Sequence, residues 1–351
     1  MKNDVGPRRL SKPQWFGSAV TVATEASAAI PLEPFPVLLL TAMEPHIDKA
    51  RKSRQQALDA IKKATRAPVY KKIMNRYLNT PLSKEGRLSF DPQKYPLREA
   101  LLETCGLPPT TNLARLHTGG DGVPSKVHLL KHLTERPQKL QTVYDEFVRQ
   151  VCCPRVSELW DDGGQEEENS IYYYQCFPCL RMVQPGDFSI GPHADVVYGH
   201  HPLSTNFYVL LTDLAPPQSS AALFLESTPG AEDWHPILGN YGGEKGGGVT
   251  HFPGGRCMHW TAENNTSMTR VSLDFRIIPG SLYNAMVDGG GEEDGKIDVF
   301  RKTEGYYSQC RRKGSKGQWE RIGPLLAPDT RVGFPWTVSN WEKLMEQKQK
   351  H

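Results

Sequence analysis

The stretch Arg-Val-Ser-Leu-Asp-Phe-Arg-Ile at residues 270–277 alternates polar with apolar side chains. Successive side chains of a β-strand point to opposite faces, so the polar residues would share one face and the apolar residues the other. A charged strand face inside a folded core needs a partner or a wet cavity. This stretch therefore predicts a strand that lies between an apolar core and a polar cavity.

Short β-rich runs precede this strand and are separated from one another by turn residues. The expected strands are Tyr172–Met182, Asn206–Thr212, Ala222–Glu226, Gly248–Phe252, Cys257–Ala262 and Arg270–Ile278. Pro-Gly and Asn-Asn pairs stand in several of the gaps, where they favour tight turns. Many short strands at close spacing indicate an antiparallel sandwich or barrel.

Amphipathic patterns upstream of the strands predict helices. Apolar side chains recur at helical spacing over Pro45–Leu78, which Pro68 should break. The same spacing recurs over Leu97–Cys105 and over Pro137–Cys153, which Pro154 should end. We therefore expect an α+β fold in which N-terminal helices flank the β core.

The changes of pattern along the chain predict its organisation. Residues 1–44 should be loose or irregular, and residues 45–280 should form one domain with its β core at 171–280. Residues 281–351 should be a polar and irregular C-terminal extension, and their tyrosines and tryptophans favour packing onto the core.

Composition narrows the classes of partner. The 351 residues include 42 basic and 39 acidic side chains, a net charge of +3, which disfavours nucleic acid or a membrane surface. No apolar run approaches the ~20 residues of a membrane span. Seven cysteines without disulfide spacing favour an intracellular protein with reduced thiols, cytoplasmic or, after removal of a targeting peptide, organellar. The sequence leaves the oligomeric state open.

Three residues could hold a metal ion. His193 and Asp195 stand two residues apart just after Pro192, so on an extended segment both side chains point the same way. His259 lies 66 positions after His193 (259 − 193) in another expected strand and supplies a third ligand if the strands meet in a barrel. Two histidines and one carboxylate leave positions open on the ion, an arrangement that suits Fe(II).

Arg270 and Ser272 share the polar face of the strand that follows His259. A guanidinium binds a carboxylate through a bidentate fork, and a hydroxyl adds one hydrogen bond. This pair would suit the distal carboxylate of 2-oxoglutarate.

The His-x-Asp pair, the distal histidine and the Arg-x-Ser pair resemble the Fe(II)/2-oxoglutarate-dependent dioxygenases, which share a double-stranded β-helix (jelly-roll, cupin-like) core. Over about residues 140–280 the chain resembles the phytanoyl-CoA-hydroxylase-like branch and its streptomycin-cluster enzymes. This longer likeness includes Pro185-Gly186-Asp187, Gly191-Pro192-His193-Ala194-Asp195, Tyr198-Gly199-His200-His201-Pro202, Leu211-Thr212-Asp213 and Arg270 to Pro279. Algal kainoid synthases, which close a pyrrolidine ring oxidatively, are the most specific candidates.

The resemblance implies a role for each matching residue. It gives His193, Asp195 and His259 as iron ligands and Arg270, Ser272 and Asn206 as cosubstrate contacts. Arg181, Tyr198, His200 and His201 are candidate substrate contacts, each with a structural role as the alternative. An aspartate at position 195, where related halogenases carry a small residue, argues against halogenation.

The expected reaction is the oxidation of a C–H bond in a small natural-product or amino-acid-like molecule, by hydroxylation or oxidative cyclisation. Fe(II), O2 and 2-oxoglutarate would take part, giving succinate and CO2. Two alternatives stay open: a non-catalytic jelly-roll binding protein, and a cupin-type metalloenzyme that needs no 2-oxoglutarate. A requirement for 2-oxoglutarate separates the main hypothesis from both.

Overall fold

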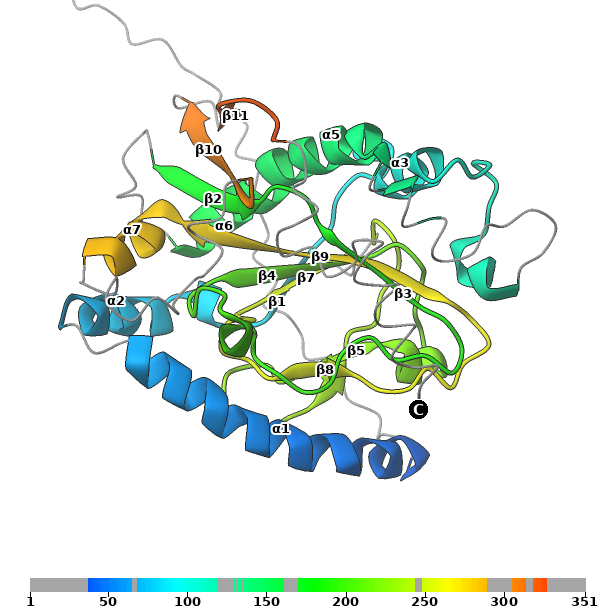
Figure 1. Cartoon of the computed structure of the whole chain (residues 1–351), viewed down its shortest axis with the longest axis horizontal. Helices are drawn as coiled ribbons and strands as arrows, with labels where there is room; N and C mark the ends of the chain where they lie inside the picture. Colours follow the sequence, from blue (N-terminus) through cyan, green and yellow to red (C-terminus); the bar gives the residue numbers. More distant parts are fainter. Residues whose placement is uncertain are drawn as a thin grey trace, which may run out of the picture.

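A computed structural model of the chain describes residues 37–64, 68–118, 135–160, 170–243, 248–288, 305–313 and 318–326, together with Leu129, His132 and Leu133. The outer parts of the two expected terminal segments, residues 1–36 and 327–351, lie outside these residues. The described chain forms two antiparallel sheets between layers of helices (Figure 1). The helices are α1 (Val37–Ala64), α2 (Pro68–Leu78), α3 (Leu97–Thr104), α5 (Gln138–Phe147), α6 (Cys153–Trp160) and α7 (Gly280–Asp288).

The larger sheet has eight strands in the order β1-β7-β4-β9-β2-β10-β11, and β3 pairs with β9 as well. Its strands are β1 (Gly86–Leu88), β2 (Ile171–Gln175), β3 (Cys179–Val183), β4 (Thr205–Leu210), β7 (Val249–Phe252), β9 (Arg270–Pro279), β10 (Tyr307–Lys313) and β11 (Gln318–Ile322). Strand β9 is central, with β4 on one edge and β3 followed by β2 on the other. All its pairings are antiparallel, which confirms the α+β class.

The smaller sheet has three strands in the order β6-β5-β8, namely β6 (His235–Pro236), β5 (Leu223–Leu225) and β8 (His259–Thr261). His193 forms an isolated bridge with His259 and so continues this sheet by one residue. Buried side chains of both sheets form one cluster, including Tyr208, Phe252 and Leu225. This cluster fills part of the space between the sheets.

The two faces of β9 lie in different environments, as the alternating sequence predicts. Its apolar face lies in the main core, where the Phe275 ring is 5.0 Å from that of Tyr144 and 5.5 Å from that of Phe207. Arg270, Asp274 and Arg276 line a cavity on the other face. The prediction of a strand between a core and a polar cavity is confirmed.

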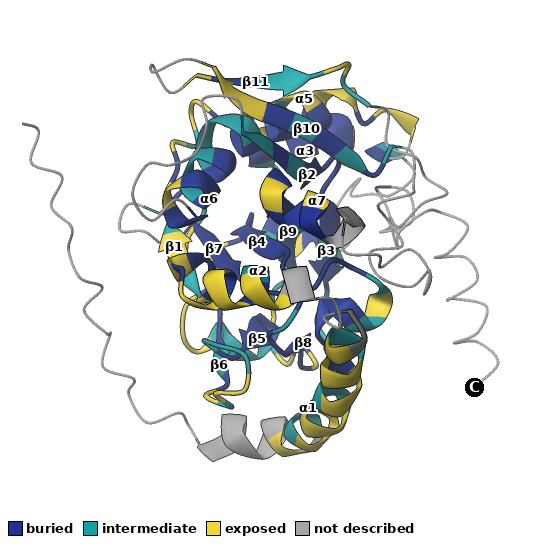
Figure 2. Cartoon of the chain, turned by 90° about the vertical axis from the view of Figure 1, so that its left-hand side faces the viewer, coloured by how far each residue is buried: buried dark blue, intermediate teal, exposed yellow. Residues whose placement is uncertain are grey.

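Helix α1 covers the smaller sheet with one face and is exposed on the other (Figure 2). Ala50 and Ala57 are buried in a cluster with Trp260. Arg54 on the same helix donates to the buried Glu226 carboxylate at 2.8 Å. Helix α1 begins at Val37, earlier than the start expected at Pro45. Among the described residues, no helix has the length and apolar character of a membrane span.

The helix expected to end at Pro154 continues, so that prediction is wrong. A π-helical turn, Val148–Cys152, leads from α5 directly into α6, which begins at Cys153. Pro154 therefore lies directly after the π-helical turn, in the first turn of α6, and does not end the helical run. The run expected as one strand at Tyr172–Met182 is also divided, into β2 and β3.

Beyond Gly280 the chain is more regular than its polar sequence indicated. Strand β10 extends the larger sheet by pairing with β2, and β11 pairs with β10. Arg321 of β11 donates to Asp145 of α5 at 2.8 Å, and Arg149 donates to the Trp319 carbonyl at 3.0 Å. These contacts attach the hairpin to the body of the protein.

Phe275→Ala should lower the free energy of unfolding by about 3–5 kcal/mol, because it leaves a cavity between β9 and α5. Urea unfolding followed by circular dichroism measures the change. Leu58→Ala, at an exposed position on α1, should stay within about 0.5 kcal/mol of the parent. An equal effect of both substitutions would contradict the assigned core.

Candidate metal centre

Backbone pairing brings His193 and Asp195 close to β8. The His193 N–H donates to the His259 carbonyl at 3.1 Å, and the His259 N–H donates back to His193 at 2.9 Å. The Asp195 N–H donates to the Gly254 carbonyl at 2.9 Å, at the start of a 3-10 turn, Asp195–Tyr198. These bonds hold the segment that carries His193 and Asp195 against the chain around β8.

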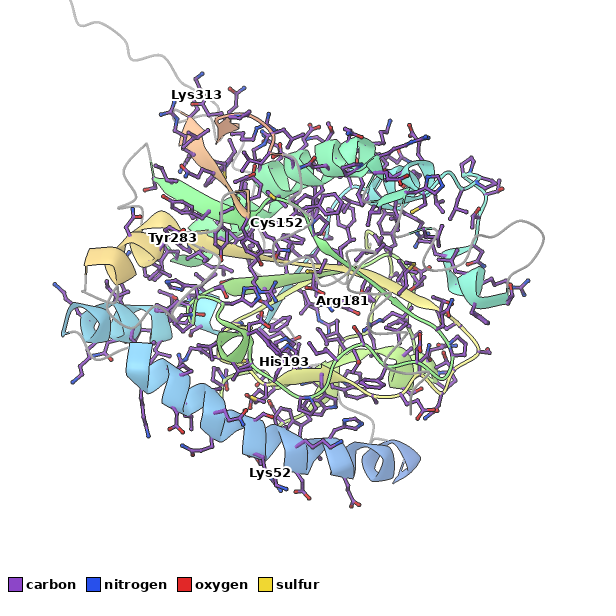
Figure 3. All side chains as sticks on the ribbon, in the orientation of Figure 1. Lys52, Cys152, Arg181, His193, Tyr283 and Lys313 are labelled. Carbon is purple, nitrogen blue, oxygen red and sulfur yellow. The ribbon has the colours of Figure 1, made fainter. Side chains whose placement is uncertain are left out.

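The ligand atoms of His193, Asp195 and His259 all lie within 4.8 Å of one another. Among the described residues, this is the one His/Cys/Asp/Glu group able to hold a metal ion. The three residues are 4%, 1% and 5% exposed and line one cavity together with Arg181; Figure 3 shows where His193 and Arg181 lie.

Both imidazoles are oriented as metal-binding histidines commonly are. The Nδ1 atoms donate to the carbonyls of Gly191 at 2.8 Å and Cys257 at 3.0 Å, since a carbonyl can only accept. In a neutral ring this leaves a lone pair on Nε2, and those atoms are 3.3 Å and 3.4 Å from the Asp195 Oδ1. Burial, with the neighbouring His259, lowers the pKa of His193 and so favours its neutral form.

Asp195 Oδ1 is buried and has no hydrogen-bond partner among the described residues. Two nitrogen lone pairs and a carboxylate oxygen that face one another repel unless a cation or protons lie between them. A divalent ion would satisfy all three atoms, so the residues present fit a metal.

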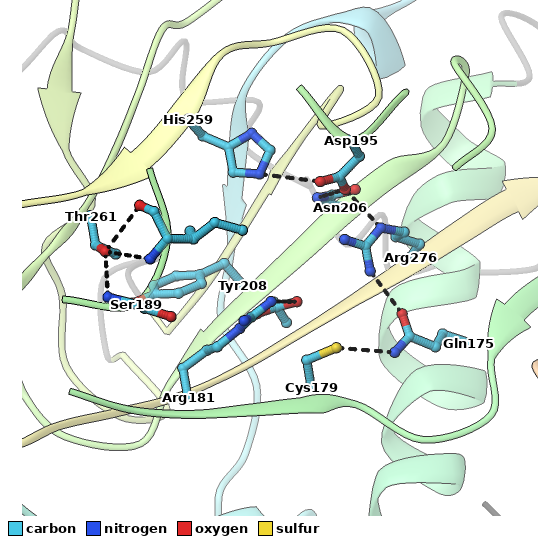
Figure 4. A network of polar contacts seen from close by, with 12 residues as sticks. Gln175, Cys179, Arg181, Ser189, Asp195, Asn206, Tyr208, His259, Thr261 and Arg276 are labelled. Atoms are coloured by element: carbon cyan, nitrogen blue, oxygen red, sulfur yellow. Dashed lines mark hydrogen bonds and ion pairs between the residues drawn. The ribbon is translucent and has the colours of Figure 1, made fainter. Parts of the chain in front are cut away.

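The other oxygen of this carboxylate is fully engaged. Asp195 Oδ2 accepts from Asn206 Nδ2 and Arg276 Nε, each at 2.7 Å (Figure 4). Burial alone would raise the pKa of Asp195, but the Arg276 guanidinium bonded to Oδ2 outweighs it and holds that pKa well below its usual value. The carboxylate is therefore ionised at neutral pH, with one oxygen left for a metal.

The cavity beside this cluster contains about 380 Å³ of empty space, its open mouth included, and Arg270 lines it. Arg270 is 1% exposed; its Nη1 donates to the Tyr208 hydroxyl at 3.1 Å, and its Nε has no hydrogen-bond partner among the described residues. Ser272 on the same face of β9 is buried, and its hydroxyl also has no such partner.

Arg181 and Asn206 also line the cavity, and both have partners in it. Arg181 Nε donates to Asp274 Oδ2 at 2.6 Å, a contact between neighbouring strands β3 and β9. The amide of Asn206 donates to Asp195, so the structure places it on a candidate ligand. Its contact with a cosubstrate stays a prediction.

The remaining candidate substrate contacts are set apart from the cavity lining. Tyr198 is 54% exposed, with its ring 5.0 Å from that of His193. His200 and His201 are buried; His201 accepts from the Leu203 N–H at 3.1 Å and stacks on Tyr283. Tyr198 is thus close to the cluster, while His200 and His201 are buried and are not among the residues that line the cavity.

The sequence did not single out several residues that shape this site. Thr261 accepts from the N–H groups of Ser189 and Ile190 at 2.8 Å and 3.0 Å and so fixes the loop that leads to His193. Tyr208 bonds Arg270. Arg276 was already placed on the polar face of β9 by the alternation of its sequence, but its partner is Asp195. Tyr208 and Thr261 carry no such signal.

No protein-family model matches the chain. The chain is similar to the streptomycin biosynthesis protein StrG of Streptomyces griseus, with 25% identity over 206 residues, 58% of this chain and 88% of that protein. Two structures of the non-heme monooxygenase ThoJ, a nickel complex and an apo form, match at 14% and 13% identity. Each match covers 58% of this chain and 77% of that chain, and the TM-scores of 0.36 and 0.35 are too low to assign the fold.

Gly254→Ala should weaken metal binding by about 10- to 100-fold, because a Cβ there would lie 2.2 Å from the Asn206 amide and displace it from Asp195. Equilibrium titration with Co(II) measures the affinity. Gly191→Ala is the matched control, since a Cβ there meets nothing within 4 Å. Equal affinities for the two variants would show that the amide does not support the site.

Proposed function

We propose that the chain is an Fe(II)- and 2-oxoglutarate-dependent dioxygenase that oxidises a C–H bond of a small natural-product molecule. The observation that carries this proposal is Arg270. Its buried guanidinium lines the same cavity as the His193, Asp195 and His259 cluster and has no carboxylate partner among the described residues. A buried charge of this kind calls for an anionic ligand, and Ser272 offers a further donor.

The fold and a relative support the same proposal. His259 belongs to the smaller antiparallel sheet and Arg270 to the larger one, and both line one cavity, an arrangement that suits the expected jelly-roll core. StrG is named as a streptomycin biosynthesis protein, which supports a natural-product substrate. Ring closure of the kind that kainoid synthases perform stays a prediction.

Each group of the cavity would then have a task. His193, Asp195 and His259 would hold Fe(II), and their three donor atoms leave room on the ion for a bidentate cosubstrate and O2. Bound iron, with O2 and 2-oxoglutarate, supplies the oxidation itself, and the protein supplies position and exclusion of water. Arg270 would bind the distal carboxylate of 2-oxoglutarate and so set its orientation.

Arg181 is the proposed substrate contact. It lines the cavity, and its ion pair with Asp274 holds its guanidinium in place. A substrate carboxylate could bind Arg181 while a cationic group binds Asp274, which suits an amino-acid-like molecule. The alternative role of the pair is to join β3 to β9.

Anaerobic addition of Fe(II) and then 2-oxoglutarate to the metal-free protein should produce a weak visible charge-transfer band. Arg270→Ala should weaken 2-oxoglutarate binding by about 30-fold or more, because it removes the partner of a buried carboxylate. Arg87→Ala is the control, since Arg87 is exposed and does not line the cavity. Titration of the band with 2-oxoglutarate measures each affinity.

Two outcomes would reject this function in different ways. Folded protein that binds Fe(II) but shows no band with 2-oxoglutarate would favour a cupin-type enzyme that needs no such cosubstrate. A band without turnover of any oxidisable small carboxylate would favour a binding protein.

A further inference from the structure

A chain of buried side chains leads from Asp195 away from the cavity to the C-terminal part of the protein. Arg276 uses Nε for Asp195 and Nη1 for the Gln175 Oε1, at 2.7 Å and 3.0 Å (Figure 4). The Tyr306 hydroxyl donates to the same Oε1 at 3.2 Å. All four side chains are buried, so water does not replace these contacts.

The geometry fixes which way the Gln175 amide faces. Its Nε2 donates to the Phe177 carbonyl at 2.8 Å, and a carbonyl can only accept. Oε1 must therefore face Arg276 and Tyr306, both of which are donors. The Gln175 backbone carbonyl is held separately, by the Tyr144 hydroxyl at 2.7 Å.

Tyr306 is held in place by its own backbone. The Cys176 N–H donates to the Tyr306 carbonyl at 2.9 Å, and strand β10 begins at the next residue and pairs with β2. The C-terminal hairpin thus brings one hydroxyl to the end of the chain that starts at Asp195. Tyr306 is not among the residues that line the cavity.

The contact matters because of the two oxygens of Asp195. Oδ1 faces both imidazoles, whereas Arg276 and Asn206 hold Oδ2 away from them. A guanidinium that is bonded at one end alone can turn, and the carboxylate can turn with it. Gln175 bonds the other end of Arg276 and so removes that freedom.

We propose that Gln175 and Tyr306 are positioning residues of the metal centre. They fix Arg276, and through Arg276 they fix the Asp195 carboxylate so that one oxygen alone is presented to the ion. The C-terminal segment is therefore part of the site, although it contributes no ligand. This inference rests on a metal held by the His193 cluster and does not depend on 2-oxoglutarate.

Co(II) titrated into the metal-free full-length chain tests the proposal, because its visible absorption reports both affinity and the number of ligands. Gln175→Met should weaken Co(II) binding by about tenfold or more, as loss of a residue that supports a metal ligand does. Tyr306→Phe removes the hydrogen bond to Gln175 and keeps the ring, so about threefold is expected. Both variants should change the intensity of the absorption.

A double-mutant cycle separates positioning from a general structural effect. If Gln175 and Tyr306 act through Arg276, neither substitution weakens Co(II) binding further once Arg276→Met is present. Tyr174→Phe is the matched control: it removes another buried tyrosine hydroxyl of this region, one that donates to Asp145 at 2.5 Å. It should keep the parent Co(II) affinity and spectrum.

Three results would overturn the proposal. One is a Gln175→Met variant with the Co(II) affinity and spectrum of the parent. Another is full additivity with Arg276→Met, and Tyr306→Phe alone decides this point if Gln175→Met does not fold. The third is a His193→Ala variant that binds Co(II) as the parent does, which would reject the metal site itself.

Discussion

The buried ion pair between Asp195 and Arg276 is the interaction on which this site depends. Asp195 belongs to the segment attached to the smaller sheet through the bridge between His193 and His259, and Arg276 belongs to β9 of the larger sheet. Charges taken out of water are costly unless they are paired and their remaining donors and acceptors are bonded. Asp195 and Arg276 are paired in this way, and their contact also joins the two sheets across the space between them.

Because side chains alternate along β9, adjacent residues of this strand lie in the hydrophobic core and in the candidate site. Phe275 packs among the rings of the main core, while the next residue, Arg276, reaches a candidate metal ligand. A shift of one residue in register would exchange the two faces and bury the charges in the core. Pairing on both edges, with β4 and with β3, prevents that shift and so fixes the cavity as well as the sheet.

The parts of the protein that were predictable are those that local patterns encode. The spacing of His193 and Asp195 and the period of β9 could be read from a few residues each. Arg276 was visible on the polar face, but its partner Asp195 is 81 residues away and no pattern joins them. Gln175 and Tyr306 are 131 residues apart and meet because β10 adds to the edge of the sheet beside β2.

The errors have a similar origin. Pro154 has the same local chemistry at the end of one helix as in the first turn of the next, and the π-helical turn before it left no sequence signal. The C-terminal hairpin has many charged residues, and its order comes from pairing with β2, from Asp145 of α5 and from Trp319, which packs on Tyr172. Long-range contacts of this kind decide structure where local propensity is weak.

The charges of the cavity give the strongest argument about what it binds. Three guanidiniums and two carboxylates line it, and each carboxylate already has an arginine: Asp195 has Arg276 and Asp274 has Arg181. Burial would raise the pKa of Asp274 too, but Arg181 lowers it, so both carboxylates stay ionised at neutral pH.

Arg270 is the guanidinium of the cavity lining that neither carboxylate pairs with, and a divalent ion at the His193 cluster would add two more positive charges. Binding the ion therefore makes the cavity more positive and increases its need for an anion. A dicarboxylate that reaches from the ion to Arg270 would place one negative charge beside each of these positive groups. This is the physical reason to expect the metal and the cosubstrate in the same cavity.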